Sequence, residues 1–221
     1  PVAQIIKLRP WEAYVLDSPL LQRLRFIRQL GVGHLLFPSA GYSRFEHSLG
    51  TLQTVSRMFD AACDPSNVPK VLPYNETELS ARKTIVRMAA MLHDVGHCVL
   101  SHVSERHYAR DLEMRRVAKA LSTEYDANIA AAEALSVLIV RSRAFEDLLN
   151  RARIPTEVYD VPSTVQKIAA CIAGAKSSLR PDAFLAEMVN GPVDCDKLDY
   201  IARDAHAAGV PVSLDIDRLL S

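Results

Sequence analysis

One apolar helical run that ends in a cluster of titratable side chains constrains this chain more than any other part of its sequence. Residues 78–102 read ELSARKTIVRMAAMLHDVGHCVLSH, so His93 and Asp94 close the run, and His97 and His102 follow it. Imidazole and carboxylate groups are costly to bury unless they have partners. The end of this helix must therefore meet other polar parts of the fold, and such clusters are typical of functional sites.

Helical patterns also dominate the rest of the chain. Ser18 as N-cap, Pro19 at the first helical position and Gly31 as a stop predict one helix near the N-terminus. Apolar residues at helical spacing predict most of the others. The predicted helices span residues 19–30, 43–63, 78–94, two or more segments within 104–152, then 164–176, 181–191 and 192–209.

Polar residues and glycine set the expected ends of the later helices. Thr77 precedes the central run, after a polar link over residues 64–76 that contains Pro and Asn. Ser163 or Thr164 is the expected cap of the helix over residues 164–176. Gly209 is the expected stop of the last predicted helix.

The fold class follows from what these patterns leave out. We find no convincing strand, no alternation of strands and helices, and no GxGxxG or Walker loop. Hydrophobic residues make up 49 % of the 221 residues, which is enough for a sizeable core. With no repeat and no internal boundary, the sequence predicts one all-α domain over residues 1–221, with the titratable cluster at its centre.

Charge and hydropathy exclude some partners. The 26 Lys and Arg residues balance the 26 Asp and Glu residues, whereas a strong non-specific hold on nucleic acid needs a basic excess. Net charge therefore gives no support to a single-stranded nucleic acid as partner. No apolar run approaches the roughly 20 residues that span a bilayer, so a membrane partner is not expected.

The cysteines point to a reducing compartment. Cys63, Cys98, Cys171 and Cys195 form no CxxC pair, and we interpret them as buried free thiols. Together with the absence of a signal peptide, this predicts a cytoplasmic protein.

The residue types in the cluster suit a metal ion. Imidazole and carboxylate groups are usual ligands of Zn, Mn, Fe and Ni ions. Neighbouring helical residues point about 100° apart, so His93 and Asp94 can share an ion only if the helix end faces it. Further ligands must come from elsewhere, and His47 and the VDCDKLD segment offer them. For any one of these residues, an ordinary packing role is the alternative.

Four stretches together resemble a known family. LDSPLLQRLRFIRQLG, FPSAGYSRFEHSLGT, LHDVGHCVLSH and NGPVDCDKLDYIARDAHAAGV occur in this order between about residues 15 and 212. They are similar to the HD-domain metal-dependent phosphohydrolases, and most of all to the deoxynucleoside triphosphate (dNTP) triphosphohydrolase branch. Residues 106–185 match only weakly.

The resemblance implies a metal centre and a catalytic group. It places the four metal ligands at His47, His93, Asp94 and Asp196. The implied cofactor is one divalent transition metal ion (Mn, Fe, Ni, Co or Zn), with Mg accompanying the nucleotide. The implied catalytic residues are His97 and His102, of which His102 is favoured, and Glu105 as the acidic partner of His102.

The resemblance also implies a substrate. Residues of this branch that contact the triphosphate correspond to Arg44, Lys197 and Tyr200, and those that hold the sugar 3′-hydroxyl correspond to Gln29 and Asp204. Leu30 corresponds to the residue whose bulk excludes a 2′-hydroxyl. The implied reaction is hydrolysis of a dNTP at the α-phosphorus, which releases a deoxynucleoside and tripolyphosphate.

A regulatory site between subunits is implied as well. The positions that read an activating GTP or dNTP correspond to Asp17, Gln22, Arg25 and Arg218. An activator bound there would require a homo-oligomer, either a dimer or a tetramer. The alternative for this segment is the ordinary surface of a helix.

The chain departs from the family pattern in one place. The family carries a further active-site histidine in a His-Glu segment between its second and third motifs. The corresponding segment here reads LSTEYDANIAAAEAL, and no histidine occurs between His107 and His206. The resemblance also implies that the base pocket draws on residues beyond Ser221, so the domain is expected to be incomplete at its C-terminus.

Two further functions stay open on the sequence. One is an HD phosphohydrolase of another branch, acting on a nucleoside monophosphate, a cyclic nucleotide or an alarmone. The other is a module that senses nucleotides or binds nucleic acid with weak or no catalysis, which the missing histidine would explain.

Overall fold

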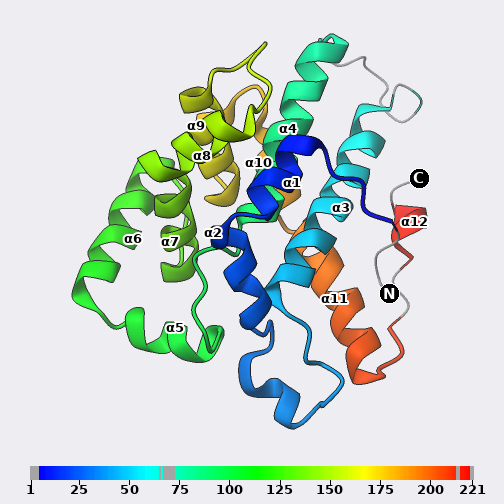
Figure 1. The fold of residues 1–221 in the computed structure, drawn as a ribbon, viewed down its shortest axis with the longest axis vertical. Coiled ribbons are helices and arrows are strands. Elements are labelled where there is room, and N and C mark those ends of the chain that lie inside the picture. Colours follow the sequence, from blue (N-terminus) through cyan, green and yellow to red (C-terminus); the bar gives the residue numbers. More distant parts are fainter. Residues whose placement is uncertain (1–4, 65, 67–72, 213–214, 220–221) are drawn as a thin grey trace.

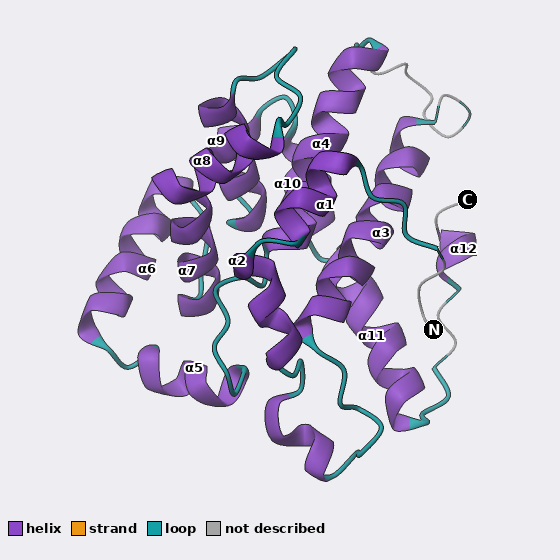
Figure 2. Cartoon of the chain, in the orientation of Figure 1, coloured by secondary structure: helices purple, strands orange, loops and turns teal. Residues whose placement is uncertain are grey.

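The computed structural model describes residues 5–64, 66, 73–212 and 215–219. The side chains of His102 and Asp217 lie outside the described part of the structure. Helices joined by loops make up the described chain, which contains one isolated β-bridge but no strand (Figure 2). The prediction of an all-α fold is therefore confirmed.

The elements follow one another along the chain as shown in Figure 1. They are α1 (Pro10–Leu16), α2 (Pro19–Gln22), η1 (Arg23–Phe26), η2 (Gly31–Leu35), α3 (Arg44–Cys63), α4 (Glu76–Leu92), α5 (His102–Tyr108), α6 (Leu112–Tyr125), α7 (Ala131–Val140), α8 (Arg143–Ala152), α9 (Val161–Ile172), η3 (Ser177–Leu179), α10 (Ala183–Val189), α11 (Cys195–Ala208) and α12 (Ile216–Leu219). The region 104–152, predicted to hold two or more helices, thus contains most of α5 and all of α6, α7 and α8.

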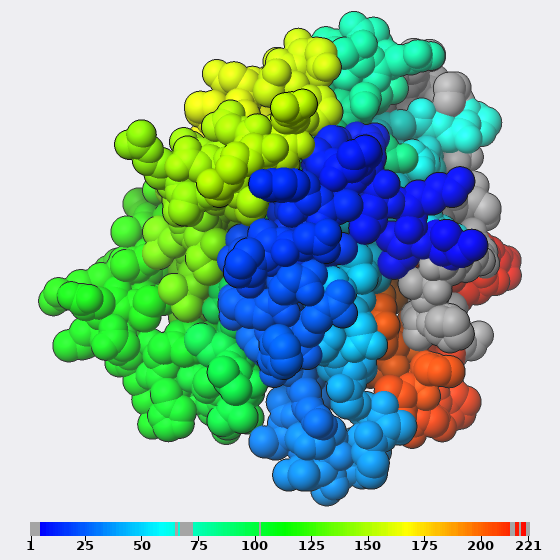
Figure 3. Space-filling model, viewed as in Figure 1, coloured from blue at the N-terminus to red at the C-terminus, as the bar shows by residue number. Residues whose placement is uncertain are grey.

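Helix α4 lies at the centre of the core. It packs against α3, α9 and α10, and α3 in turn packs against α11. Residues 84–92 are all buried, so the second half of α4 is enclosed on every side, as expected for a core helix. In the space-filling view, the blue N-terminal elements lie across the front of the molecule, between the green and yellow helices and cyan α3 (Figure 3). The C-terminal end of α4, with His93 and Asp94, is consequently held among several elements.

The helix predicted over residues 19–30 starts at Pro19 with Ser18 as N-cap, as expected, but its second part is wrong. The chain forms only the short α2 and η1 and then turns to extended backbone at Ile27, with φ −110° and ψ 114°. The N–H of Arg44 donates to the carbonyl of Ile27 at 2.8 Å, and Arg28 forms a β-bridge with Ser43. This pairing with the segment before α3 replaces the helical hydrogen bonds, and it places Gln29 and Leu30 in a loop.

Two helix starts also differ from the prediction. The side chain of Asn75, not Thr77, caps α4 by accepting from the N–H of Glu78. Asp160 caps α9 by accepting from the N–H of Ser163, so this helix begins before the predicted Ser163 or Thr164. In both cases the stronger carboxylate or amide cap lies a few residues upstream. Gly209 ends α11 with φ +66°, as predicted.

A buried ion pair joins α1, which the sequence patterns did not predict, to α4. Arg87 donates from Nε to Glu12 Oε1 at 2.6 Å and from Nη2 to Glu12 Oε2 at 2.7 Å. Glu12 is 0 % exposed and Arg87 is 5 % exposed. This two-pronged contact fixes α1 over the middle of the central helix.

We expect Arg87→Met to lower the free energy of unfolding by about 3–5 kcal/mol, because it leaves the buried Glu12 carboxylate without its cationic partner, although the backbone N–H of Arg9 still donates to it at 2.8 Å. Urea denaturation of both proteins measures this difference. The double variant Glu12→Gln/Arg87→Met should recover most of the loss, because it removes the buried charge as well. A single variant as stable as the wild type would show that Glu12 does not depend on Arg87.

The remaining sequence expectations concern thiols and membranes. All four cysteines are free; Cys171 and Cys195 are buried, whereas Cys63 and Cys98 are half-buried. Within the described ranges, no helix combines the length and the apolar character needed to cross a lipid bilayer.

Candidate active site

A cavity of about 470 Å³ opens at the C-terminal end of α4. Elements far apart in the sequence build its wall, namely the loop before η2 and the starts of α3, α7 and α11. It is lined by Gln29, Leu30, Arg44, His93, Asp94, His97, Glu105, Ala130, Ala132, Glu133, Ile172, Val189, Asn190, Asp194, Asp196, Lys197, Tyr200 and Asp204. Most of the residues singled out from the sequence therefore lie on one surface.

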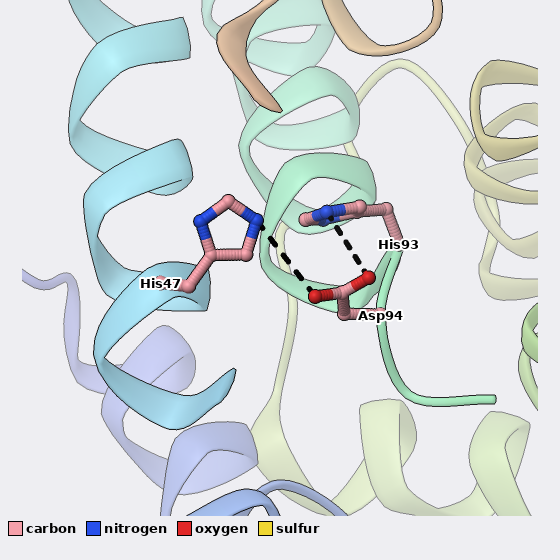
Figure 4. Close-up of side chains that lie close together, drawn as sticks. All are labelled: His47, His93 and Asp94. Carbon is pink, nitrogen blue, oxygen red and sulfur yellow. Dashed lines mark ion pairs between the residues drawn. The ribbon is translucent and has the colours of Figure 1, made fainter. Parts of the chain in front are cut away.

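Two imidazoles and a carboxylate meet beside this cavity. His47 reaches in from α3, while His93 and Asp94 follow the end of α4 (Figure 4). Asp94 Oδ2 lies 3.7 Å from His47 Nε2, and Asp94 Oδ1 lies 3.4 Å from His93 Nε2. Each residue offers one ligand atom, and these three atoms all lie within 4.8 Å of one another.

The backbone and a second carboxylate orient the two rings. His93 Nδ1 lies 2.7 Å from the carbonyl oxygen of Ala90, and His47 Nδ1 lies 2.8 Å from Asp199 Oδ2. Carbonyl and carboxylate oxygens only accept hydrogen bonds, so each Nδ1 carries a proton. Both Nε2 atoms are therefore the ones that can bind a metal ion, and they face the same space.

The donor set fits a divalent transition metal ion. Both Nε2 atoms are buried and have no hydrogen-bond partner among the described residues. Asp196, at the start of α11, places Oδ1 at 2.9 Å from His47 Nε2 and 3.7 Å from His93 Nε2. Mixed imidazole and carboxylate ligands suit such ions, and an ion bound here would satisfy the unpartnered nitrogens.

Asp199, one of the carboxylates that the VDCDKLD segment offered as further ligands, instead supports this group through His47. Arg203 holds its carboxylate by two hydrogen bonds, from Nε at 3.0 Å and from Nη2 at 2.8 Å. Gly50 on α3 lies against this pair, since a Cβ there would fall 1.9 Å from Asp199 Oδ1. Asp196 and Asp199 are three residues apart and so share one face of α11, and this spacing is the signal that could have identified Asp199.

The charged side chains in this group strongly shift one another's pKa values. Burial alone would lower the pKa of His93, but the carboxylates of Asp94 and Asp196 outweigh it and raise this pKa to about 10. Burial would raise the pKa of Asp94, but His93 and Arg44 hold it well below its usual range. The carboxylates are thus ionised at neutral pH, and a metal ion competes with protons for the ring nitrogens.

His97 and Glu105 form a second pair on the cavity wall. His97 Nδ1 contacts Glu105 Oε1, and His97 Nε2 lies 3.1 Å from Asp94 Oδ1. Burial works against protonation of His97, but Asp94 and Glu105 together raise its pKa. An imidazolium held in this way is suited to giving up a proton. His102 begins α5, but its side chain lies outside the described residues.

Arg44 occupies the boundary between the metal ligands and the rest of the cavity. Its guanidinium donates from Nη1 to Asp94 Oδ2 and from Nη2 to Ser101 Oγ. Ser101 in turn donates to the carbonyl of Gln29 at 2.9 Å, and it adopts a positive φ of 52°. This chain of contacts ties the loop of Gln29 to the metal ligands.

The other predicted substrate residues line the same cavity. Lys197 Nζ donates to the carbonyl of Gly191 at 2.9 Å and contacts Asp194, while Tyr200 lies one turn further along α11. Gln29 and Leu30 reach the wall from the loop before η2, and Asp204 reaches it from α11. The structure thus brings together the residues assigned to phosphate and to sugar.

The segment without the expected histidine also lies at the site. Ala130, Ala132 and Glu133, at the start of α7, line the cavity. The Glu133 side chain accepts from the N–H of Ala130 at 2.8 Å. Two alanines and a carboxylate therefore line the cavity in the segment where the family resemblance implied an imidazole.

The residues assigned to an activator lie elsewhere. Asp17 is exposed at the end of α1, and Gln22 Oε1 accepts from Arg25 Nε at 2.7 Å. Arg25 also stacks on Phe45, with its guanidinium carbon 3.7 Å from the ring centre. Arg218 is exposed on α12, which lies apart from α2 in Figure 1. Within one chain, Gln22 and Arg25 are in contact, whereas α12, which carries Arg218, lies apart from them.

Comparison with known proteins identifies the family. The sequence profile of the HD domain matches residues 44–173, which is more than half of the chain and includes His47, His93 and Asp94. The chain belongs to the HD domain family. The three side chains that Figure 4 displays all lie within the matched region.

Curated relatives include characterised enzymes. The chain is 30 % identical to deoxynucleoside triphosphate triphosphohydrolase SAMHD1 of Homo sapiens, in a match covering all of this chain and 34 % of that protein. It is 31 % identical to SAMHD1 of Gallus gallus, covering 35 % of it. An uncharacterized protein of Mycoplasma pneumoniae is 24 % identical over 92 % of this chain. The chain thus spans about one third of the length of the SAMHD1 relatives.

Solved structures share the fold. A phosphohydrolase from Bacteroides thetaiotaomicron superimposes with a TM-score of 0.71 at 23 % identity, covering all of this chain and 44 % of its own. A hypothetical protein from Aquifex aeolicus gives a TM-score of 0.61 at 27 % identity, covering all of this chain and 49 % of its own.

Proposed function

We propose that this HD domain hydrolyses deoxynucleoside triphosphates to deoxynucleosides and tripolyphosphate. The observation that carries the proposal is the composition of one cavity wall. Metal-ligating His and Asp side chains, the cations Arg44 and Lys197, and the polar pair Gln29 and Asp204 all face the same 470 Å³ space. A dNTP needs these three kinds of contact together, and the SAMHD1 relatives are named for that reaction.

The ligands of the metal ion in this proposal are His47, His93, Asp94 and Asp196. When bound, a divalent ion supplies Lewis-acid stabilisation of negative charge on phosphate oxygens. Its identity among Mn, Fe, Ni, Co and Zn is a matter for the experiment below. Arg44 and Lys197 bind the triphosphate by charge-assisted hydrogen bonds, and Tyr200 forms the wall beside them.

The chemical step breaks the bond between the α-phosphorus and the 5′-oxygen. Water attacks the α-phosphorus and releases one proton to solvent, and the oxygen of this water remains on tripolyphosphate. The departing 5′-oxygen of the deoxynucleoside takes up a proton. His97, oriented by Glu105, is placed to donate that proton. His102, the first residue of α5 and the donor that the family resemblance favours, is the other candidate.

Regulation is part of the same proposal. An activating GTP or dNTP would bind Asp17, Gln22 and Arg25 together with Arg218 supplied by another copy of the chain. The wide spacing of α2 and α12 within one chain supports this division of the site between subunits. A dimer or tetramer would then be the active form.

A nucleotide-sensing domain is the second candidate function. The alanines at the start of α7 favour it, because they remove an imidazole that the family uses near the substrate. Such a domain would bind a dNTP at the same residues without turning it over.

Product analysis tests the proposal. Metal-stripped protein is mixed with each dNTP and with Mn, Mg, Fe, Ni, Co or Zn in turn, with and without GTP. Chromatography separates deoxynucleoside, monophosphate and diphosphate, and a phosphate assay detects tripolyphosphate. We expect deoxynucleoside and tripolyphosphate in equal amounts, with loss of both in Asp196→Ala but not in Asp60→Ala, whose carboxylate pairs with Lys83 on the surface.

The other outcomes separate the alternatives. Binding of dNTP without turnover under every condition would refute hydrolysis and favour the sensing domain. Release of a nucleoside monophosphate or of single phosphate would assign the chain to another reaction within the HD phosphohydrolases.

A further inference from the structure

Tyr42 contacts both of the residues that form the polar end of the cavity. Its backbone carbonyl accepts from the N–H of Gln29 at 3.1 Å. Its hydroxyl donates to Asp204 Oδ1. Tyr42 lies just before the Ser43 cap of α3, so one residue links the loop of Gln29 to α11.

Gln29 and Asp204 present a matched pair of groups to a ligand. Gln29 is only 8 % exposed, and its Oε1 is buried without a hydrogen-bond partner among the described residues. The contact with Tyr42 engages Oδ1 of Asp204, so Oδ2 is the oxygen that can accept from a ligand. The Gln29 amide also carries an NH2 donor beside this unpartnered oxygen, so it can donate to a ligand as well as accept from it. With the Asp204 carboxylate as acceptor, the pair fits a hydroxyl group, which both donates and accepts.

The surroundings of Tyr42 hold it in this position. The guanidinium of Arg203 lies 5.4 Å from the centre of the Tyr42 ring while it grips Asp199. Ser39, three residues before Tyr42, donates to the carbonyl of Ala207 on α11. This hydrogen bond holds the blue loop that contains Ser39 beside orange α11 (Figure 1). Burial and the contact with Asp204 raise the pKa of Tyr42 far above its ordinary value, so its hydroxyl remains a donor at all working pH values.

We propose that Tyr42 is a positioning residue that makes the cavity select a free hydroxyl on the sugar ring of its ligand. It does so by fixing the spacing and orientation of Gln29 and Asp204. This inference rests on the proposed nucleotide substrate, and it adds a residue that the sequence motifs did not single out.

Loss of the Tyr42 hydroxyl should weaken the preference for a ligand with a free sugar hydroxyl, but it should not unfold the protein. Without this donor, the Asp204 carboxylate can rotate away from the ligand hydroxyl whose hydrogen bond it accepts. A hydrogen bond to a charged group contributes about 1.5–3 kcal/mol, and about tenfold in affinity corresponds to the lower end of that range. A ligand that lacks this hydroxyl does not use the alignment, so its affinity should be the same for the wild type and the variant.

The test compares a dNTP with the corresponding 2′,3′-dideoxynucleotide on metal-loaded protein, with GTP present. The ratio of kcat/KM for the two nucleotides is measured for wild type and for Tyr42→Phe. Should the wild type not turn over the dNTP, calorimetric binding constants on the same protein give the ratio. We expect Tyr42→Phe to lower the preference for the 3′-hydroxyl about tenfold and to leave the value for the dideoxynucleotide unchanged.

Two controls make the result specific. Tyr14→Phe removes the hydroxyl of an exposed tyrosine on α1 and should keep the wild-type preference. The double variant Tyr42→Phe/Asp204→Asn should discriminate no less than Asp204→Asn alone, because the two residues act as one unit.

Each outcome decides the inference separately from the proposed function. A wild type that hydrolyses dNTP, together with a Tyr42→Phe variant of unchanged preference, overturns the inference and leaves hydrolysis standing. A wild type without turnover, whose binding preference disappears in Tyr42→Phe, supports the inference and refutes hydrolysis. A wild type that does not distinguish the two nucleotides, or binds neither, overturns the inference.

Discussion

Asp94→Asn should abolish both metal binding and hydrolysis, with a loss in kcat of about a thousandfold or more. Asp94 is one of the proposed metal ligands, and it contacts His93, His97 and Arg44, so it also holds two groups of the proposed reaction site. Asparagine keeps the shape but removes the charge. Metal stabilisation of a phosphoryl reaction contributes several kcal/mol, and each 1.36 kcal/mol is about tenfold in rate.

Metal content and turnover measure this effect together. Protein freed of excess ion by gel filtration is analysed by mass spectrometry for bound metal, and hydrolysis is followed on the same sample. Asp60→Asn is the matched control, because its carboxylate is exposed and pairs with Lys83 far from the cavity. An Asp94→Asn protein that retained a full equivalent of metal would show that the ion is bound elsewhere.

Gly50→Ala should destabilise the fold and weaken metal binding, although alanine is the better helix former by about 1 kcal/mol. A Cβ at Gly50 would lie 1.9 Å from Asp199 Oδ1 and 2.4 Å from Arg203 Nη2. Both groups would have to move, which breaks the buried Asp199–Arg203 pair. Disruption of a buried ion pair costs about 3–5 kcal/mol, and loss of the partner of a ligating histidine costs about 10- to 100-fold in metal affinity.

Thermal unfolding with and without metal, followed by titration with the metal that supports turnover, measures both effects. Gly41→Ala is the control, since a Cβ there would make only ordinary contacts at 3.6 Å and beyond. If Gly50→Ala were stabilised, as helix propensity alone predicts, then α3 and α11 would not be packed as closely as described.

Helix identity was predictable where the determining interactions are local. Apolar spacing and a terminal glycine define α3 and the end of α11, and these interactions involve neighbours along the chain. The segment 19–30 has equally good local signals, but Ile27 and Arg28 pair with the residues before α3 and leave the helix. A pairing between segments more than ten residues apart leaves no periodic trace in either segment.

The candidate site, too, was predictable from the sequence only in part. His47, His93, Asp94 and Asp196 were assigned from the family motifs, and the structure places these side chains around one space. Two supporting contacts depend on which helix faces touch. Asp199 supports His47, and Tyr42 supports Asp204. Tyr42 precedes α3 while Asp204 lies near the end of α11, so only the packing of α11 against α3 brings them into contact.

Three helix ends meet at the cavity, and their dipoles create an electric field there. Helix α4 ends there, while α3 and α11 begin there. Aligned peptide dipoles leave about half a negative charge at a helix C-terminus and about half a positive charge at an N-terminus. The backbone therefore favours a cation beside His93 and an anion beside Arg44 and Asp196. Because no side-chain substitution removes this field, it acts on any ligand in the cavity independently of the charged side chains around it.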